Sequence, residues 1–164
     1  MLAVDTVLEK IEEKFGRKIS RVISPLAEGT DRLVVHCLID NLPIDLIVPL
    51  PADQQTYLED FNSEKSKKEY QKLISRAKQV IDLTKIDSSE RNYLGAGRYV
   101  LENCDVLLAI WDGKPSRGAG GTGQIVEEAR GKNLPVAWIK VADQQVHADK
   151  EQIPVKIIYE RFPE

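Results

Sequence analysis

The chain has 164 residues, of which 42% are apolar and 30% are charged, and its formal net charge is −3. This length and apolar content suffice for a single domain over residues 1–164 with one core, and the acidic balance argues against a protein that binds nucleic acid through phosphate charge. The longest apolar runs are too short to cross a bilayer, so we expect no contact with a membrane.

Helices and strands are expected to alternate from the start of the chain. Apolar residues recur at helical spacing between residues 4 and 15, which predicts an amphipathic helix that ends at Gly16. A strand is predicted over residues 19–23, and it ends at Ser24 and Pro25. The turn after it leads into a helix, whose apolar face is expected to be Leu33, Val34, Cys37 and Leu38.

The next strand is predicted over residues 44–48. We expect Pro49 and Pro51 to end it, because proline cannot donate to a strand ladder. Asp53 is expected to cap a short helical segment that continues to Phe61.

A longer helix is predicted after this segment. Ser66 with Glu69 is typical of a capping box, and Ser63 is the alternative start. The face expected to be buried is Tyr70, Leu73, Ile74 and Ala77.

The second half continues the alternation. A short strand over residues 79–83 is followed by a helix that contains Tyr93 and is capped by Asp87 or Ser89. Strands are predicted over residues 106–110 and 135–139, then a polar loop over 143–151 and a last strand near an edge over 155–159. This order predicts a Rossmann-like three-layer α/β/α fold with a mostly parallel sheet.

Residues 105–131 organise the rest of the chain. They predict a central strand buried on both faces, a glycine-rich loop, and a helix that runs from Gln124 to a stop at Gly131. Glycines at positions 120 and 121 leave backbone N–H groups open, and a helix start adds unpaired donors and a positive dipole end. A phosphate is therefore the expected ligand, and a mobile surface loop is the alternative. The proposed anion contacts are Gly120, Gly121, Thr122, Gly123 and Gln124.

Polar groups at other strand ends extend this candidate site. The turn after the first strand contributes Glu28, Gly29, Asp31 and Arg32, and the helix before the organising strand offers Tyr93 and Arg98. An arginine can pair with a phosphate and a carboxylate can accept ribose hydroxyls. The alternatives are that Glu28 and Asp31 cap a helix and that Arg98 forms a surface salt bridge. Trp111, at the mouth of the loop, is a candidate for stacking on a base.

The loop resembles a known motif. Residues 120–127 read GGTGQIVE and resemble the GGxGTxxE motif of LOG-type nucleoside-monophosphate phosphoribohydrolases, with Gln124 in place of the threonine. The resemblance implies that the glycines hold the phosphate, that Glu127 acts on the ribose and its glycosidic bond, and that Arg98 is the helix arginine of the site.

The chain from residue 23 onward resembles the wider SLOG superfamily, which includes DprA-like and YpsA-like proteins. The pieces that carry the resemblance are SPLAEGTDRL at residues 24–33, GRY at 97–99 and WDGKP at 111–115. It implies a Rossmann-like domain that binds nucleotides or nucleotide-derived ligands, often as a sensor. Relatives usually carry an additional strand before the first helix, whereas this sequence begins directly in the helix. A missed upstream start, a truncated gene and a partner chain that supplies the strand are the alternatives.

Other chemistry is not expected. His36 and His147 have no histidine or carboxylate at ligand spacing, so we predict no metal and no cofactor. The two cysteines, Cys37 and Cys104, have no CxxC spacing, and the amino terminus does not read as a signal peptide. Both features favour a cytoplasmic protein with reduced thiols.

Three functions remain open. The first is a module that binds a nucleotide or nucleotide-derived small molecule, and the second is an active phosphoribohydrolase that cleaves an N-glycosidic bond. The third is a degenerate domain that acts only in dimerisation. A homodimer is the expected assembly.

Overall fold

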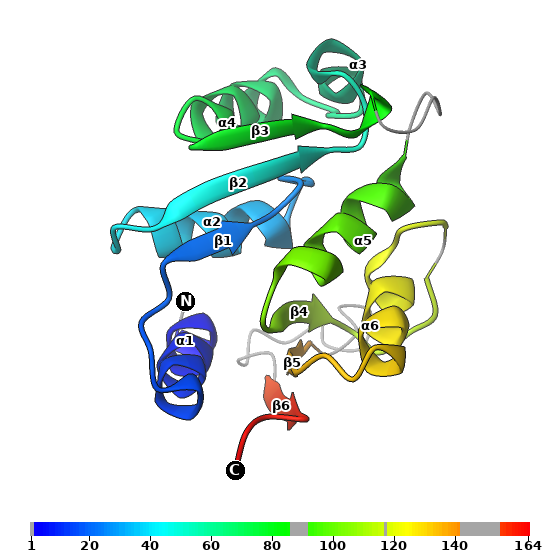
Figure 1. Cartoon of the computed structure of the whole chain (residues 1–164). Coiled ribbons are helices and arrows are strands. Elements are labelled where there is room, and N and C mark those ends of the chain that lie inside the picture. The colour runs from blue at the N-terminus through cyan, green and yellow to red at the C-terminus, as the bar shows by residue number, and fades with distance from the viewer. Residues whose placement is uncertain (1, 86–91, 117, 142–154) are drawn as a thin grey trace, which may run out of the picture. The chain divides into compact units, whose positions relative to one another are not determined.

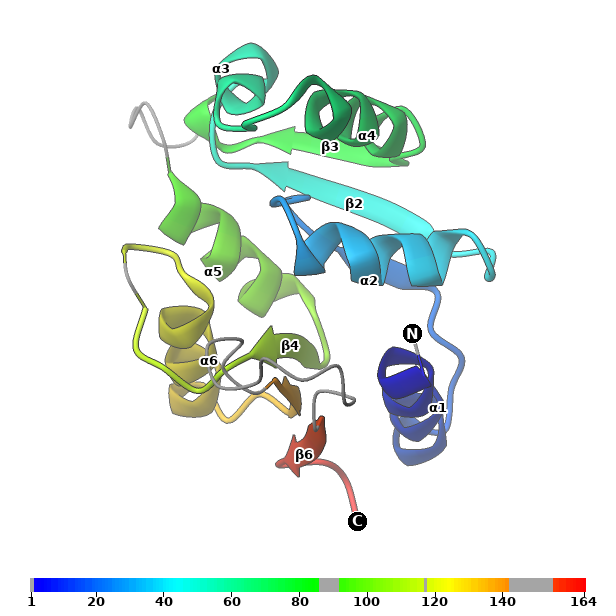
Figure 2. The same cartoon turned by 180° about the vertical axis from the view of Figure 1, so that it is seen from behind.

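The computed structural model describes residues 2–85, 92–116, 118–141 and 155–164. The chain forms two compact units, drawn in Figures 1 and 2: the central unit (Lys18–Cys104) and the terminal unit (Met1–Arg17 with Asp105–Glu164). In the described residues, each unit contains one three-stranded sheet with parallel neighbours and accompanying helices. The predicted α/β class is therefore confirmed, whereas the Rossmann-like three-layer arrangement stays a prediction.

The sheet of the central unit is parallel throughout, in the order β1-β2-β3. The middle strand β2 (Asp45–Leu50) pairs with β1 (Arg21–Ile23) and β3 (Gln79–Asp82), and all of its residues from Leu46 to Leu50 are buried. Burial along a whole strand is typical of parallel sheets covered on both faces. The helices of this unit, seen in Figure 1, are α2 (Thr30–Ile39), α3 (Gln54–Glu59), α4 (Glu64–Ile74), the short 3-10 turn η1 (Leu83–Lys85) and α5 (Tyr93–Asn103).

The prediction that Pro49 and Pro51 end this strand is half right: β2 ends at Leu50, directly before Pro51, but Pro49 lies inside it. The Ser24 N–H donates to the Ile47 carbonyl at 3.1 Å, which shows that alternate residues of β2, Pro49 included, direct their backbone groups toward β1. The pairing of β1 with β2 ends at Ile23 and Ile47, whereas Pro49 pairs in register with Ile81 on the other side. Its missing N–H therefore costs no bond of the β2–β3 ladder.

The buried face of α2 differs from the predicted one. Leu33 is 46% exposed, and the inward positions are Arg32, Val35, Leu38 and Ile39, with Cys37 beside them. Cys37 and Leu38 are buried as predicted, whereas Leu33 is not, because the buried face begins at Arg32 and an arginine carries no hydrophobic signal. Cys37 is a free, buried thiol.

Side-chain caps set the starts of the other helices of the central unit. Asp53 accepts the N–H groups of Gln55 and Thr56, so its predicted capping role is confirmed. Ser63 caps α4 by accepting the Ser66 N–H at 3.1 Å, so the predicted capping box at Ser66 is wrong and its alternative is right.

The start of α5 is capped by a residue that the sequence analysis did not select. Asn92 accepts the Gly95 N–H at 2.7 Å, and α5 begins at Tyr93. Asp87 and Ser89, the two predicted caps, lie outside the described residues.

The terminal unit combines helix α1 (Leu2–Phe15) and α6 (Thr122–Gly131) with strands β4 (Leu107–Trp111), β5 (Val136–Lys140) and β6 (Lys156–Glu160). β5 is the middle strand of this sheet, parallel to β4 and antiparallel to β6. The strand after residue 105 was predicted to be the central one, but in this sheet the central strand is β5. Gly16, at φ 62°, follows α1 directly, which confirms it as the residue that ends the helix.

Helix α6 is longer at its start and ends differently than predicted. It begins at Thr122 rather than Gln124, and Gly131 is its last helical residue rather than its stop. The residue in the left-handed conformation is Asn133 at φ 57°, and the Leu134 N–H donates back to the Ala129 carbonyl at 3.0 Å. Asparagine thus supplies the helix-ending conformation for which glycine was predicted.

Among the helices of the described residues, none has the length and apolar content that crossing a bilayer requires.

Candidate functional site

The glycine-rich loop of the terminal unit lies between the carboxyl end of β4 and the start of α6. Gly120 has φ 78°, a conformation that L side chains rarely adopt, and Gly121 is the extended residue before the helix. No side chain caps this helix start. The first-turn donors of α6 are therefore not satisfied in the usual way by a serine or aspartate.

Most of the N–H groups of the loop have partners within it. The Gly121 N–H donates to the Gly118 carbonyl at 3.3 Å, and the Gln124 N–H donates to the Gly121 carbonyl at 3.0 Å. The Gly120 N–H donates at 3.0 Å to the side-chain Oε1 of Gln124. With the described residues, the N–H groups of Thr122 and Gly123 make no hydrogen bond. Two predicted anion donors thus have no hydrogen-bond acceptor among the described residues, although Gly123 is buried, and a third is held by a side-chain oxygen.

The glycines of the loop also have a packing role. A Cβ atom at Gly123 would lie 2.9 Å from the Lys114 carbonyl oxygen, 3.0 Å from the Ser116 nitrogen and 3.2 Å from Trp111 Cζ2. A Cβ atom at Gly121 would collide with Ser116 Oγ. The loop folds closely over the first turn of α6, and at Gly123 the obstructing atoms are backbone, whereas at Gly121 the nearest atom is a side-chain hydroxyl that can rotate away.

Trp111 is engaged by protein groups. Its indole N–H donates to the Lys114 carbonyl at 2.8 Å, and its ring centroid lies 5.1 Å from that of Trp138. The Trp138 indole N–H in turn donates to the Trp111 carbonyl at 3.0 Å. Trp111 thus fixes the loop against the sheet, and its predicted stacking on a base stays a prediction.

Glu127 lies on an exposed part of α6 and forms an ion pair with Arg130. The Nε and Nη2 atoms of Arg130 also donate to the two carboxylate oxygens of Glu160 on β6, at 2.8 and 2.7 Å. Hydrogen bonds to Glu160 and Glu127 raise the pKa of Arg130, and the bond to Arg130 lowers the pKa of Glu160. Glu127 therefore belongs to an ion-pair network that ties α6 to the end of the sheet.

The loop between β1 and α2 carries the predicted acidic residues of the central unit. Glu28 and Gly29 are exposed, and Gly29 precedes α2 at φ 100°. Leu26, fully buried, has φ 59°, an unusual conformation for a leucine, and its N–H donates to Ser24 Oγ at 3.1 Å. Backbone strain of this kind, at the carboxyl end of a parallel strand, is found at ligand sites more often than elsewhere.

Asp31 lies in the first turn of α2 beneath this loop. Its Oδ2 lies 3.5 Å from Ser24 Oγ, and the Ala27 N–H also interacts with the carboxylate. Burial raises the pKa of the Asp31 carboxyl above its ordinary value of 3.8, and this effect outweighs the opposing hydrogen bonds of Ala27 and Ser24 and the charge of Arg32. The carboxylate is thus partly desolvated and has no ion-pair partner in direct contact among the described residues.

Asp31→Asn is expected to raise the free energy of unfolding at neutral pH. A raised pKa means that the protonated carboxyl favours folding, a contribution that is complete below pH 3.8 and is lost as the pH rises through the folded-state pKa. Asparagine carries no charge, so the difference in the free energy of unfolding between Asp31→Asn and the wild type should grow from low to neutral pH. Urea unfolding at several pH values measures it.

The matched control is Asp53→Asn, since hydrogen bonds from Thr56 lower the pKa of this exposed cap. Its carboxylate favours folding above pH 3.8, so this variant should lose stability relative to the wild type as the pH rises, the opposite sign. An Asp31→Asn protein less stable than wild type at neutral pH would disprove the desolvation of Asp31.

Arg32 points into the core of the central unit and is 1% exposed. Its Nε donates to the Leu26 carbonyl at 2.9 Å, and its Nη1 donates to both the carbonyl and the hydroxyl of Ser66 at 2.8 Å. Its guanidinium carbon lies 4.1 Å from the centre of the Phe61 ring, and its ion pair with Glu69 is 3.3 Å long. These contacts give Arg32 a structural role: it joins the strained loop, α2 and α4.

Tyr93 and Arg98 lie on α5. The Tyr93 hydroxyl donates to Asp60 Oδ2, and the ring centroids of Tyr93 and Tyr57 are 6.3 Å apart. Tyr93 is 38% exposed and Arg98 is exposed. Tyr93 is thereby joined to an aromatic cluster that the sequence analysis missed, whose other members are Tyr57, Phe61 and Tyr70.

The predicted site residues divide between the two units. Glu28, Gly29, Asp31, Arg32, Tyr93 and Arg98 belong to the central unit, and Trp111, the 120–124 loop and Glu127 belong to the terminal unit. A single site made from both groups stays a prediction.

A search of the described residues finds no group of three or more His, Cys, Asp or Glu side chains that could hold a metal ion. His36 lies 3.3 Å from carboxylate oxygens of both Asp40 and Glu69, so the prediction that it has no carboxylate at ligand spacing is wrong, and His147 lies outside the described residues. None of the known protein families, curated proteins or solved structures matches the chain.

Proposed function

We propose that the protein binds a nucleotide or nucleotide-derived molecule through its phosphate, at the loop before α6. The observation that supports this most directly is the set of N–H groups at residues 120, 122 and 123. Within the described residues the N–H groups of exposed Thr122 and buried Gly123 make no hydrogen bond, and that of Gly120 is held by a side-chain oxygen of Gln124 rather than by the backbone.

This arrangement suits an anion for two physical reasons. The uncapped start of a ten-residue helix places unsatisfied donors and the positive end of its dipole at one point. The Gln124 oxygen occupies a position on the Gly120 N–H that a phosphate oxygen is equally able to take. Phosphate binding would then exchange a neutral hydrogen-bond acceptor for a charged one.

Binding is proposed rather than hydrolysis. Glu127, the residue expected to act on the glycosidic bond, is paired with Arg130, which is itself anchored by Glu160. This network holds the Glu127 carboxylate at the helix surface in a supporting role. The proposed role is that of a sensor module, which binds its ligand without cleaving it. The ligand contacts expected from Glu28, Asp31, Tyr93 and Arg98 stay predictions.

Gln124→Thr is expected to strengthen the binding of AMP about two- to tenfold, because it frees the Gly120 N–H from a hydrogen bond worth about 0.5–1.5 kcal/mol. Gln124→Glu is the matched control, since it keeps the shape of the side chain but places a negative charge where the phosphate would lie. We expect it to weaken binding by tenfold or more. Isothermal titration calorimetry with AMP measures both.

The same samples test the alternative. Chromatography of AMP after incubation should show no release of adenine by the wild type or by either variant. Equal AMP affinities in the wild type and both variants would contradict the placement of the phosphate at this loop, and adenine release that disappears in Glu127→Gln would restore the hydrolase hypothesis.

A further inference from the structure

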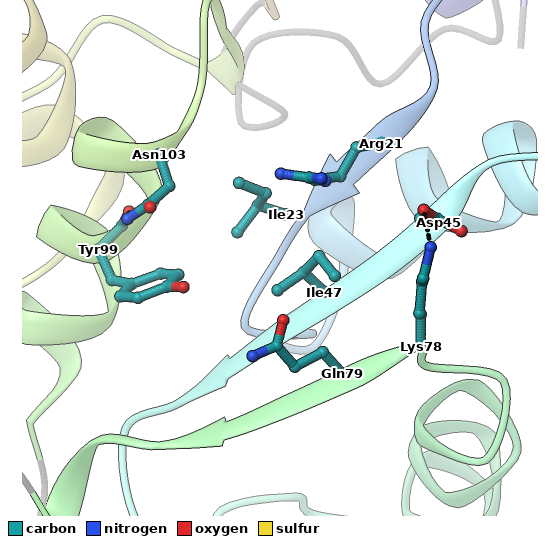
Figure 3. A pocket seen from close by; sticks show the side chains of 8 residues that line it. All are labelled: Arg21, Ile23, Asp45, Ile47, Lys78, Gln79, Tyr99 and Asn103. Carbon is teal, nitrogen blue, oxygen red and sulfur yellow. Dashed lines mark hydrogen bonds and ion pairs between the residues drawn. The ribbon is translucent and has the colours of Figure 1, made fainter.

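A pocket of about 260 Å³ opens on one face of the central unit's sheet, beside α5 (Figure 3). Ile23 and Ile47, which are partners in the β1–β2 register, form its apolar floor. Polar side chains surround this floor from three elements, Arg21 from β1, Gln79 from β3, and Tyr99 and Asn103 from α5. All of these residues lie within one unit.

The sheet register explains why these side chains meet. Ile47 pairs with Ile23 on one side and with Gln79 on the other, and Arg21 precedes Ile23 by two residues, so all four lie on one face of the sheet. Tyr99 and Asn103 are four residues apart on α5 and share one face of the helix. In Figure 3 both point from α5 toward the strands, and Arg21 and Gln79 extend into the same space.

The pocket holds one unmatched positive charge. Lys78, at its far side, is paired with Asp45 at 2.6 Å, so these two charges cancel. The guanidinium of Arg21 makes no ion pair or hydrogen bond with any residue that the structure describes. Its cross-strand partner is Asp45, whose carboxylate is already taken by Lys78. Arg21 is therefore available to an anion.

The other polar groups are neutral. Asn103 Nδ2 donates to the Tyr99 carbonyl at 2.8 Å, which fixes the amide and leaves its oxygen as an acceptor. The Tyr99 hydroxyl and the Gln79 amide have no hydrogen-bond partner within the described parts of the chain. A ligand would thus meet a cation at one side, isoleucines and a tyrosine ring in the middle, and neutral hydrogen-bonding groups at the other side.

We propose that this pocket binds a small planar carboxylate with a polar substituent on its ring. A single guanidinium matches a carboxylate of charge −1 better than a phosphate monoester, which carries about −1.5 to −2 at neutral pH. The volume of about 260 Å³ lies below the range of roughly 300–1,000 Å³ for drug-sized ligands, which limits the ligand to about one ring. This site is separate from the loop before α6, so it stands or falls independently of the proposed nucleotide site.

Amide NMR spectra of the full chain, titrated with para-hydroxybenzoate, test the proposal. We expect saturable shifts at Ile23, Ile47 and Tyr99. The uncharged para-hydroxybenzamide should bind at least tenfold more weakly, because it lacks the charge that Arg21 recognises. Inorganic phosphate should not displace the carboxylate.

Variants assign the contact to Arg21. Arg21→Gln should weaken the binding of para-hydroxybenzoate about ten- to a hundredfold, as expected for a lost charge-assisted pair. Arg17→Gln is the matched control, because Arg17 is exposed and paired with Asp105 in the terminal unit, and it should leave the affinity unchanged. Thermal melts should show both variants folded.

Three results would overturn the assignment. They are the absence of shifts in the pocket at up to about 10 mM para-hydroxybenzoate, equal affinities for the acid and its amide, and an Arg21→Gln protein that binds as tightly as wild type.

Discussion

Arg32→Ala is expected to lower the free energy of unfolding by about 2–5 kcal/mol, the cost of truncating a buried side chain and leaving buried hydrogen-bond acceptors without a donor. The side chain is 1% exposed, and its removal would leave Ser66 Oγ and the Leu26 carbonyl without their donor. It would also open a cavity beside Phe61. Since small proteins are stable by about 5–15 kcal/mol, this loss is large enough to read directly from urea unfolding.

Two comparisons isolate the cause. Arg32→Lys keeps the charge but cannot reach Leu26 and Ser66 together, so it should also be strongly destabilised. Arg17→Ala removes an arginine whose ion pair with Asp105 is exposed, and it should cost less than about 1 kcal/mol. If Arg32→Ala cost no more than Arg17→Ala, the structural role of Arg32 would be refuted.

Gly123→Ala is expected to destabilise the protein by about 1–2 kcal/mol, although alanine is the better helix former. The added Cβ would press on backbone atoms, the Lys114 oxygen at 2.9 Å and the Ser116 nitrogen at 3.0 Å, which cannot turn aside as a flexible side chain does. Trp111 contacts the same position at 3.2 Å, so its fluorescence should report the displacement of the loop during denaturant unfolding.

Gly131→Ala is the control on the same helix. A Cβ at Gly131 meets nothing within 4 Å, so this substitution should gain up to about 1 kcal/mol from helix propensity alone. Opposite signs for the two variants are the expected outcome. Equal stabilisation by both would mean that the loop does not pack against the start of α6 as described.

Local signals predicted much of the fold. Asp53 caps α3, Gly16 follows α1, and Tyr70 and Leu73 are buried in α4, because in each case neighbours in the sequence determine the structure. The bounds of the strands predicted over residues 79–83 and 135–139 also agree with those of β3 and β5 within a residue or two.

Two of the errors came from contacts distant in sequence. Pro49 was expected to end a strand, but whether a proline disrupts β2 depends on how far β1 extends beside it. Ser66 was expected to be a cap, yet it is buried and receives Arg32 from 34 residues away. Such pairings follow from the tertiary structure and leave no periodic signal in the sequence.

The candidate site shows the same division. The glycine-rich loop was found from sequence, but the sequence did not reveal that Gly121 and Gly123 are needed for packing. The hydrogen bond between Gln124 and the Gly120 N–H was also unforeseen, and it makes Gln124 the informative position.

The most direct test of the nucleotide proposal is an amide NMR titration that compares AMP with adenosine. We expect AMP to shift the N–H resonances of Gly120, Thr122 and Gly123 in a saturable way, and adenosine, which lacks the phosphate, to leave them in place. Binding of AMP with no change at these three resonances would contradict the account.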